Sequence, residues 1–266
     1  MSLGVLIRNP VDSGVLVDGR SLNYANVESG AGQATLCAFN GAIPGDPVVN
    51  VFSAAITSVL PPLIALRWAP GGGEYLSSPQ LVGGPGNWTG FSLVGIKPSG
   101  ASVTHMPIEY KVFAVGVQSS ATTGMRIRRL DNSIVIDSGH QPLNIKKIAR
   151  WKEDWWYDAA ASGAYFWRDE FYFDGATYKL VWNEYVCATL VSDDLYVIQL
   201  TTMNDTQTIY AFSDGSVVRT SDNVGNHHIN GIGRPAAGKM TRRFIERSFN
   251  FDTEPNQSRE NLFFVE

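Results

Sequence analysis

The 266-residue sequence has a formal net charge of −4, and 17% of its residues are charged. With no block of Lys and Arg, this balance excludes a nucleic-acid surface, which needs clustered positive charge to neutralise phosphates. No apolar run approaches the roughly 20 residues that a membrane-spanning helix needs, so we expect no transmembrane segment. The 26 glycines and the 11% aromatic content favour short strands joined by tight turns. The sequence therefore predicts an all-β protein of two β-sandwich-like domains, with few or no helices.

The first predicted element is a β-hairpin in residues 4–19, "GVLIRNPVDSGVLVDG". It opens with Gly4, alternates apolar residues, turns on a polar cluster and ends in an apolar triplet before Asp18. Alternation with a period of two is the pattern of a half-buried strand, and the polar cluster marks the turn.

Several strands separated by Gly and Pro follow, including "ATLCAF", "VVNVFSAAITSV", "FSLVGI" and "IEYKVFAVGV". A second hairpin then appears at 124–139, "GMRIRRLDNSIVIDSG", ending on Asp137. The two hairpins agree in order, and the later "LN" of Leu22-Asn23 matches that of Leu143-Asn144. Two readings stay open. Any two hairpins look alike under period-two alternation, or the unit is duplicated and frames an N-terminal domain of residues 1–150.

The composition changes after Arg150, where aromatic residues crowd the sequence, and we place a second, aromatic-rich β domain at 151–266. Aromatic rings stack on sugars, but in β domains they more often fill a core or a subunit contact. Both a glycan site and a subunit contact therefore stay open for this segment. The candidate binding residues are Trp151, Trp155, Trp156, Tyr157, Trp167 and Trp182.

Further strands are expected at "DLYVIQLTTM", "QTIYAFS" and "SVVRTS". "DG" turns at Asp174 and Asp214 are of the kind that closes hairpins. The best candidate for a short helix is "GKMTRRFIERSF", residues 238–249. Near the end of the sequence, "LFFVE" could dock as an edge strand on another subunit.

The stretches "GVLIRNPVDSGVLVDGRSLNYANVESG", "YKVFAVG" and "GMRIRRLDNSIVIDSGHQPLNI" occur in this order. In this the chain resembles the small β-rich tail proteins of tailed bacteriophages, over roughly residues 1–150. The resemblance implies a structural virion protein of the tail tip, baseplate or tail fibre, made in the host cytoplasm. It also implies a homo-oligomer, with a trimer favoured, that binds other tail proteins. Residues 1–150 would attach to the particle, and 151–266 would contact a subunit or a host glycan or protein receptor.

No signature of catalysis accompanies this pattern. The sequence lacks a G-x-S-x-G nucleophile elbow and a phosphate-binding G-x-x-x-x-G-K-[ST] loop. Adjacent His227 and His228 would point to opposite faces of a strand, which is the wrong spacing for a shared metal. We therefore expect no catalytic residues, metal or cofactor. The alternative function is a non-catalytic carbohydrate-binding module that uses the Trp-rich segment, and a polysaccharide enzyme is the third candidate.

Overall fold

The computed structural model describes residues 6–8, 15–18, 23–38, 47–71, 74–97, 103–129, 131–149, 156–157, 163–173, 176–199, 212–213, 216–217, 228–247 and 262–266. The backbone alone is described at 6–8, 15–18, 156–157, 163–173 and 176–187, among other strand residues. Within the described ranges every regular element is a β-strand, which confirms the predicted all-β class.

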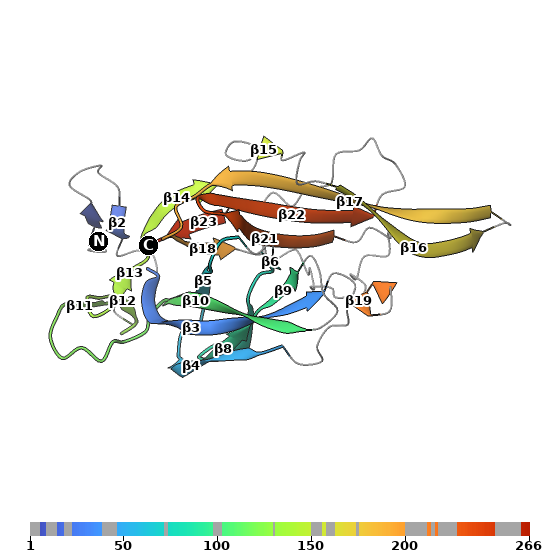
Figure 1. Cartoon of the computed structure of the whole chain (residues 1–266). Helices are drawn as coiled ribbons and strands as arrows, with labels where there is room; N and C mark the ends of the chain where they lie inside the picture. Colours follow the sequence, from blue (N-terminus) through green and yellow to red (C-terminus); the bar gives the residue numbers. More distant parts are fainter. Residues whose placement is uncertain are drawn as a thin grey trace.

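One large mixed sheet of 14 strands, nearly barrel-shaped, dominates the described structure (Figure 1). In spatial order its strands are β14 (Ile145–Ala149), β23 (Leu262–Val265), β18 (Tyr196–Gln199), β5 (Leu63–Arg67), β10 (Thr104–Ala114), β3 (Ala25–Ala38), β9 (Val94–Lys97), β6 (Tyr75–Leu76), β21 (His228–Ala236), β22 (Lys239–Arg247), β17 (Ala176–Leu190) and β15 (Trp156–Tyr157). Two further strands pair outside this path: β13 (Gln141–Pro142) with β3, and β16 (Gly163–Phe173) with β17.

Four smaller sheets accompany it in the described ranges. Three are hairpins: β1 (Leu6–Arg8) with β2 (Val15–Asp18), β11 (Arg126–Arg128) with β12 (Ile134–Asp137), and β19 (Phe212–Ser213) with β20 (Ser216–Val217). The fourth, which we call the small sheet, has the order β4 (Val49–Ile56), β8 (Asn87–Ser92), β7 (Gln80–Gly84).

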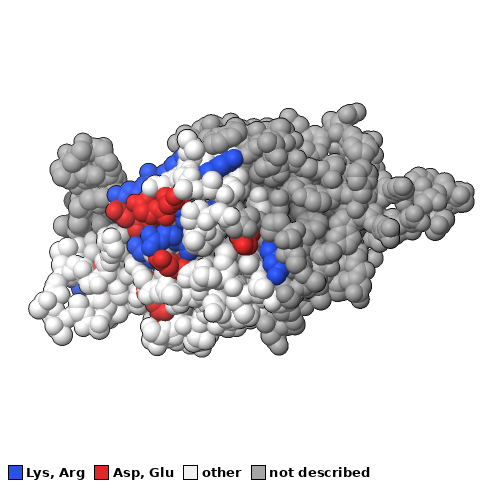
Figure 2. Space-filling model, viewed as in Figure 1, with Lys and Arg blue, Asp and Glu red and all other residues white. Residues whose placement is uncertain are grey.

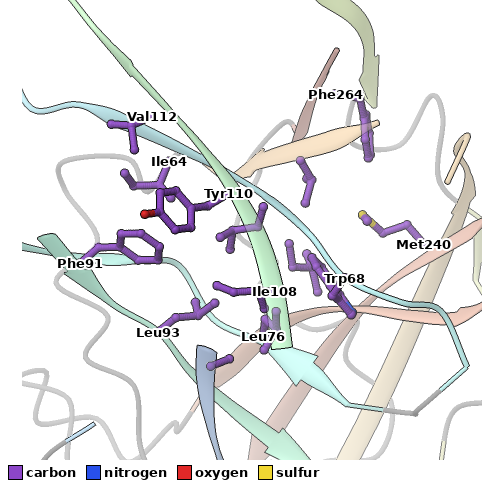
Figure 3. Close-up of a cluster of buried hydrophobic side chains, with 14 of the residues drawn as sticks. Ile64, Trp68, Leu76, Phe91, Leu93, Ile108, Tyr110, Val112, Met240 and Phe264 are labelled. Atoms are coloured by element: carbon purple, nitrogen blue, oxygen red, sulfur yellow. The ribbon is translucent and has the colours of Figure 1, made fainter. Parts of the chain in front are cut away.

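The main core combines buried side chains from the small sheet and from the large one (Figure 3). Phe91 from β8 meets Tyr110 from β10 edge-on, with ring centroids 5.2 Å apart. Aromatic pairs prefer this edge-to-face geometry, and both rings are removed from water. The cluster continues through Trp68 to Met240 and Phe264, so residues from both ends of the sequence fill it.

The burial pattern of β10 explains its place at the centre of the sheet. Ile108 and Tyr110 are buried while Glu109 between them is exposed, as expected for a strand with one covered face. From Val112 onward consecutive residues are buried, because Phe113 joins a second cluster on the opposite face, with Ala65 and Ile198. A sheet covered on both faces favours the continuous apolar run seen there.

Two polar side chains fasten the small sheet to β3. The Asn50 side-chain amide accepts a hydrogen bond from Gln33 N at 2.8 Å and donates to Gln33 O at 3.0 Å. The Glu28 carboxylate accepts from Ser53 N at 3.0 Å and from Ser53 Oγ at 2.9 Å. These contacts satisfy backbone groups that strand pairing would otherwise satisfy, and so they fix how β4 crosses β3.

The large sheet joins strands from both sides of residue 150. β14 pairs with β23, β5 with β18, and β6 with β21. The hydrogen bonding therefore does not separate 1–150 from 151–266. The division into two domains, 1–150 and 151–266, stays a prediction.

The "DG" hairpins are confirmed, because Phe173 pairs with Ala176 and Ser213 with Ser216. Two other expectations are wrong. The helix candidate at 238–249 is largely strand β22, paired on both sides by β17 and β21. Likewise, β23 lies between β14 and β18 of its own chain and is not an edge strand on another subunit.

Candidate functional site

The aromatic residues predicted to form a binding site are distributed over three strands. Trp156 and Tyr157 form β15, Trp167 lies in β16 and Trp182 in β17. Trp151 and Trp155 lie outside the described residues. That these aromatic residues bind a glycan or a subunit stays a prediction.

Backbone register shows which of these positions are neighbours. Trp182 pairs with Tyr165 across the β16–β17 hairpin, which extends beyond β21 and β22 (Figure 1). Trp156 instead pairs with Ala188, six residues further along β17. At the rise of a strand this separation is about 20 Å. The predicted aromatic set therefore occupies two places on β17.

The repeated hairpins have the same backbone pairing. In the first, Leu6, Ile7 and Arg8 pair with Asp18, Val17 and Val15, with an irregularity after Ile7. In the second, Arg126, Ile127 and Arg128 pair with Asp137, Ile136 and Ile134, with the irregularity after Ile127. The register, the position of the irregularity and the Asp at the end of the second strand all coincide. This correspondence favours duplication over chance similarity.

In the second hairpin, Asp137 is the last residue of β12, and its carboxylate is held by four hydrogen-bond donors. The Asp137 carboxylate accepts hydrogen bonds from Ser119 N at 2.9 Å, Ser119 Oγ at 2.8 Å and Gly139 N at 3.0 Å. Arg126 Nε completes the set at 2.8 Å. Burial alone would raise the pKa of Asp137, but these four donors outweigh it and hold the pKa well below its usual value. The carboxylate is therefore ionised, and it fixes the hairpin against Ser119 in the segment before it.

The second hairpin and the residues after it also contact Asn23 and Tyr24, which directly precede β3. Leu143 N donates to Tyr24 O at 2.9 Å, and the Asn23 side-chain amide donates to Val135 O at 3.4 Å. A small pocket lies at this junction, lined by Asn23, Tyr24, Ile134, Asp137 and His140 among others. His140 Nε2 is buried there with no hydrogen-bond partner among the described residues. The junction thus joins residues that follow the first hairpin to the second hairpin and to the residues after it.

A polar cluster on three adjacent interior strands of the large sheet, β18, β5 and β10, is satisfied internally. Glu109 Oε2 accepts from Arg67 Nε at 3.1 Å and from the Tyr196 hydroxyl at 3.0 Å. The Arg67 hydrogen bond is the main cause that lowers the pKa of Glu109. The Arg67 guanidinium carbon also lies 4.7 Å from the Tyr196 ring centroid, a cation–π contact. Arg67, Glu109 and Tyr196 therefore stabilise one another across β5, β10 and β18, and the Glu109 carboxylate is engaged by both partners.

Sequence reasoning identified Asp137 as part of the repeat but missed the residues that hold it. Ser119 lies in an irregular segment 18 residues earlier, and nothing in its local pattern marks it as a partner. One signal in the sequence does point to Arg126. It is a charged residue at the strand position that apolar Leu6 occupies in the first hairpin, and both positions pair with the terminal Asp.

In the part of the chain that the structure describes, no three His, Cys, Asp or Glu side chains come close enough to hold a metal. Nor do those residues include a helix of the length and apolarity needed to span a bilayer. No protein-family model, no curated protein and no solved structure gives a significant match to this chain.

Proposed function

We propose that this chain is a structural protein of a bacteriophage tail that assembles with copies of itself and with other tail proteins. The observation that carries the proposal is the pair of hairpins with one register, at 6–18 and 126–137. The hairpins belong to the stretches whose order along the sequence resembles that in tail proteins. They lie toward the two ends of residues 1–150, the segment that carries the resemblance.

The chemistry of the described residues supports a scaffold. The Asp137 carboxylate is engaged by Ser119 and Arg126. The Glu109 carboxylate is engaged by Arg67 and Tyr196. Such contacts fix strands and turns relative to one another. A rigid β framework suits a particle component that must hold its shape while contacting several partners.

Copurification tests this role. Particles of the phage that encodes the chain would be purified on a density gradient, and the chain would be quantified against known tail proteins. We expect a constant ratio to tail proteins across the particle peak. A chain that stays with the soluble lysate proteins, with none in the particle peak, would contradict the role.

A second candidate function rests on the β16–β17 hairpin. Its register pairs Tyr165 with Trp182 and Phe171 with Tyr178. Cross-strand aromatic positions of this kind are used to stack on sugars. For a glycan-binding protein we expect Trp182→Ala to abolish adsorption to host polysaccharide while the thermal midpoint and oligomeric state stay unchanged. Thr177→Ala, on the same strand, serves as the control.

A further inference from the structure

The pocket between the second hairpin and the start of β3 has a volume of about 30 Å³. Ala25, Ala114 and Val117 contribute apolar lining, and Tyr24 and His140 bring polar groups. One water needs about 10–15 Å³ of such space, whereas pockets for small-molecule ligands measure about 300–1,000 Å³. The pocket therefore has room for one or two waters and excludes a sugar or a nucleotide.

One ring nitrogen of His140 is buried at this place. Its Nε2 atom has no hydrogen-bond partner among the described residues. The residue itself is held in position, because its backbone N–H donates to Asp137 O at 3.0 Å. A buried polar atom without a partner destabilises a fold, and native proteins pair nearly all such atoms with protein groups or ordered water. The buried Nε2 atom therefore calls for a ligand.

The Asp137 carboxylate, which also lines the pocket, has no capacity left for Nε2. Its Oδ1 atom accepts from Ser119 Oγ and Gly139 N, and its Oδ2 atom accepts from Ser119 N and Arg126 Nε. A carboxylate offers about four lone-pair sites, and these four donors use them.

The backbone of Tyr24 does have capacity. Tyr24 O accepts a hydrogen bond from Leu143 N at 2.9 Å, and a carbonyl oxygen carries a second lone pair. A ligand in the pocket can therefore find a second polar group besides His140 Nε2. A buried water is held by two to four such groups.

The charges around the pocket favour water over an ion. In Figure 2 the surface where Figure 1 places β11 and β12 is nearly all white, and charged side chains of both signs gather further along the described surface. Arg126 already balances the charge of Asp137. A neutral histidine either donates or accepts at Nε2, according to its tautomer, and water can complement both forms.

We propose that this pocket binds an ordered water that is hydrogen-bonded to His140 Nε2 and to the Tyr24 carbonyl oxygen. The water links the start of β3 to the segment that follows the second hairpin, beside the direct hydrogen bond from Leu143 N to Tyr24 O. The second hairpin is thus attached to the large sheet through solvent as well as through direct contacts.

A high-resolution crystal structure of the full chain tests the proposal. We expect a well-ordered water about 2.7–3.2 Å from Nε2, within the range of a hydrogen bond. A structure with no water at that place would overturn the proposal, as would one in which Nε2 bonds to a protein group or to a larger solute.

Nuclear Overhauser effects between water and ring protons check the same site in solution. The His140 ring should show the sign of a long-lived water, whereas His105, which is exposed on β10, should not. Equal behaviour of the two rings would contradict an ordered water at His140.

The variant His140→Phe keeps the ring and removes Nε2. We expect the thermal midpoint to fall by about 2–4 °C, the shift that loss of one net hydrogen bond produces in a chain of this size. His105→Phe, at an exposed position, is the control and should leave the midpoint nearly unchanged. An unchanged or raised midpoint in His140→Phe would mean that Nε2 has no partner to lose. None of these results bears on copurification with particles, so the tail role is tested separately.

Discussion

Small residues on β3 let the small sheet approach closely. At Gly32 an added Cβ would lie 2.3 Å from Asn50 Oδ1, and at Gly30 it would lie 2.7 Å from the Tyr110 hydroxyl oxygen. Both distances are below van der Waals contact, so the pattern "SGAGQA" in β3 is explained by the side chains that cross it. The composition shows that glycine is abundant, but it does not show why Gly30 and Gly32 are needed, because Asn50 and Tyr110 lie elsewhere in the sequence.

We expect Gly32→Ala to destabilise the fold by about 1–3 kcal/mol, because it displaces Asn50 from the Gln33 backbone. Chemical denaturation would measure the free energy of unfolding. Gly84→Ala is the matched control, since a Cβ there meets nothing within 4 Å. Equal stability of the two variants would show that β4 does not cross β3 in this way.

The depressed pKa of Asp137 makes part of the stability dependent on pH. A carboxyl whose folded pKa lies below its unfolded value of about 3.9 stabilises the fold above that pH and loses this contribution as the pH falls further. At pH 7 we expect Asp137→Asn to lower the free energy of unfolding by about 2–3 kcal/mol. The difference from wild type should shrink between about pH 4 and pH 2. Denaturation at several pH values measures it.

The control is Asp131→Asn, which changes an exposed carboxylate in the turn of the same hairpin. It should have a much smaller effect at pH 7. A pH-independent loss in Asp137→Asn would mean that Asp137 is not held as an ionised group.

At the scale of elements, local patterns predicted hairpins well. The apolar alternation and "DG" turns are short-range signals, and strand pairing follows them at 163–190 and 212–217. The helix candidate at 238–249 failed for a long-range reason. Met240 and its neighbour Thr241 are both buried, so the two faces of β22 are covered there, and β17 and β21 pair with its two edges. Tertiary pairing therefore overrode a weak local preference.

A graft tests whether the repeated hairpins are equivalent. Replacing residues 126–137 by the sequence of 6–18 keeps apolar residues at the positions of Ile127, Ile134 and Ile136 and puts Leu in place of Arg126. We expect a folded protein destabilised by about 1–2 kcal/mol, because the carboxylate keeps the Ser119 and Gly139 donors.

The single variant Arg126→Leu should account for most of this loss. A graft that does not fold, while Arg126→Leu does, would show that the two hairpins are alike only in pattern. Circular dichroism and denaturation of the two proteins would distinguish these results.

The candidate site was only partly predictable at this scale. Aromatic density marked residues 151–182, but the sequence held no information that Trp156 and Trp182 pair with different parts of the large sheet.

At the scale of the whole molecule, the large sheet depends on strands from both sides of residue 150. β23 connects β14 to β18, and β18 connects to β5. The change in sequence composition at residue 150 predicts a domain boundary there. Composition carries no record of pairing between strands more than a hundred residues apart.

We therefore expect a fragment of residues 1–150 to lack a stable fold, because β14 loses its partner β23 and β5 loses β18. The full chain should unfold in one cooperative calorimetric transition that includes both segments. Two separate transitions, with the first reproduced by the isolated fragment, would show two independent domains.

The central claim, a structural role in a phage tail, is tested most directly by imaging intact particles labelled on this chain. A peptide tag inserted in the exposed segment 121–123 would be bound by a gold-labelled antibody and located by electron microscopy. We predict label at the tail tip, baseplate or fibres of most particles. Label on the head, or tagged chain present in the cells with no labelled particles, would contradict it.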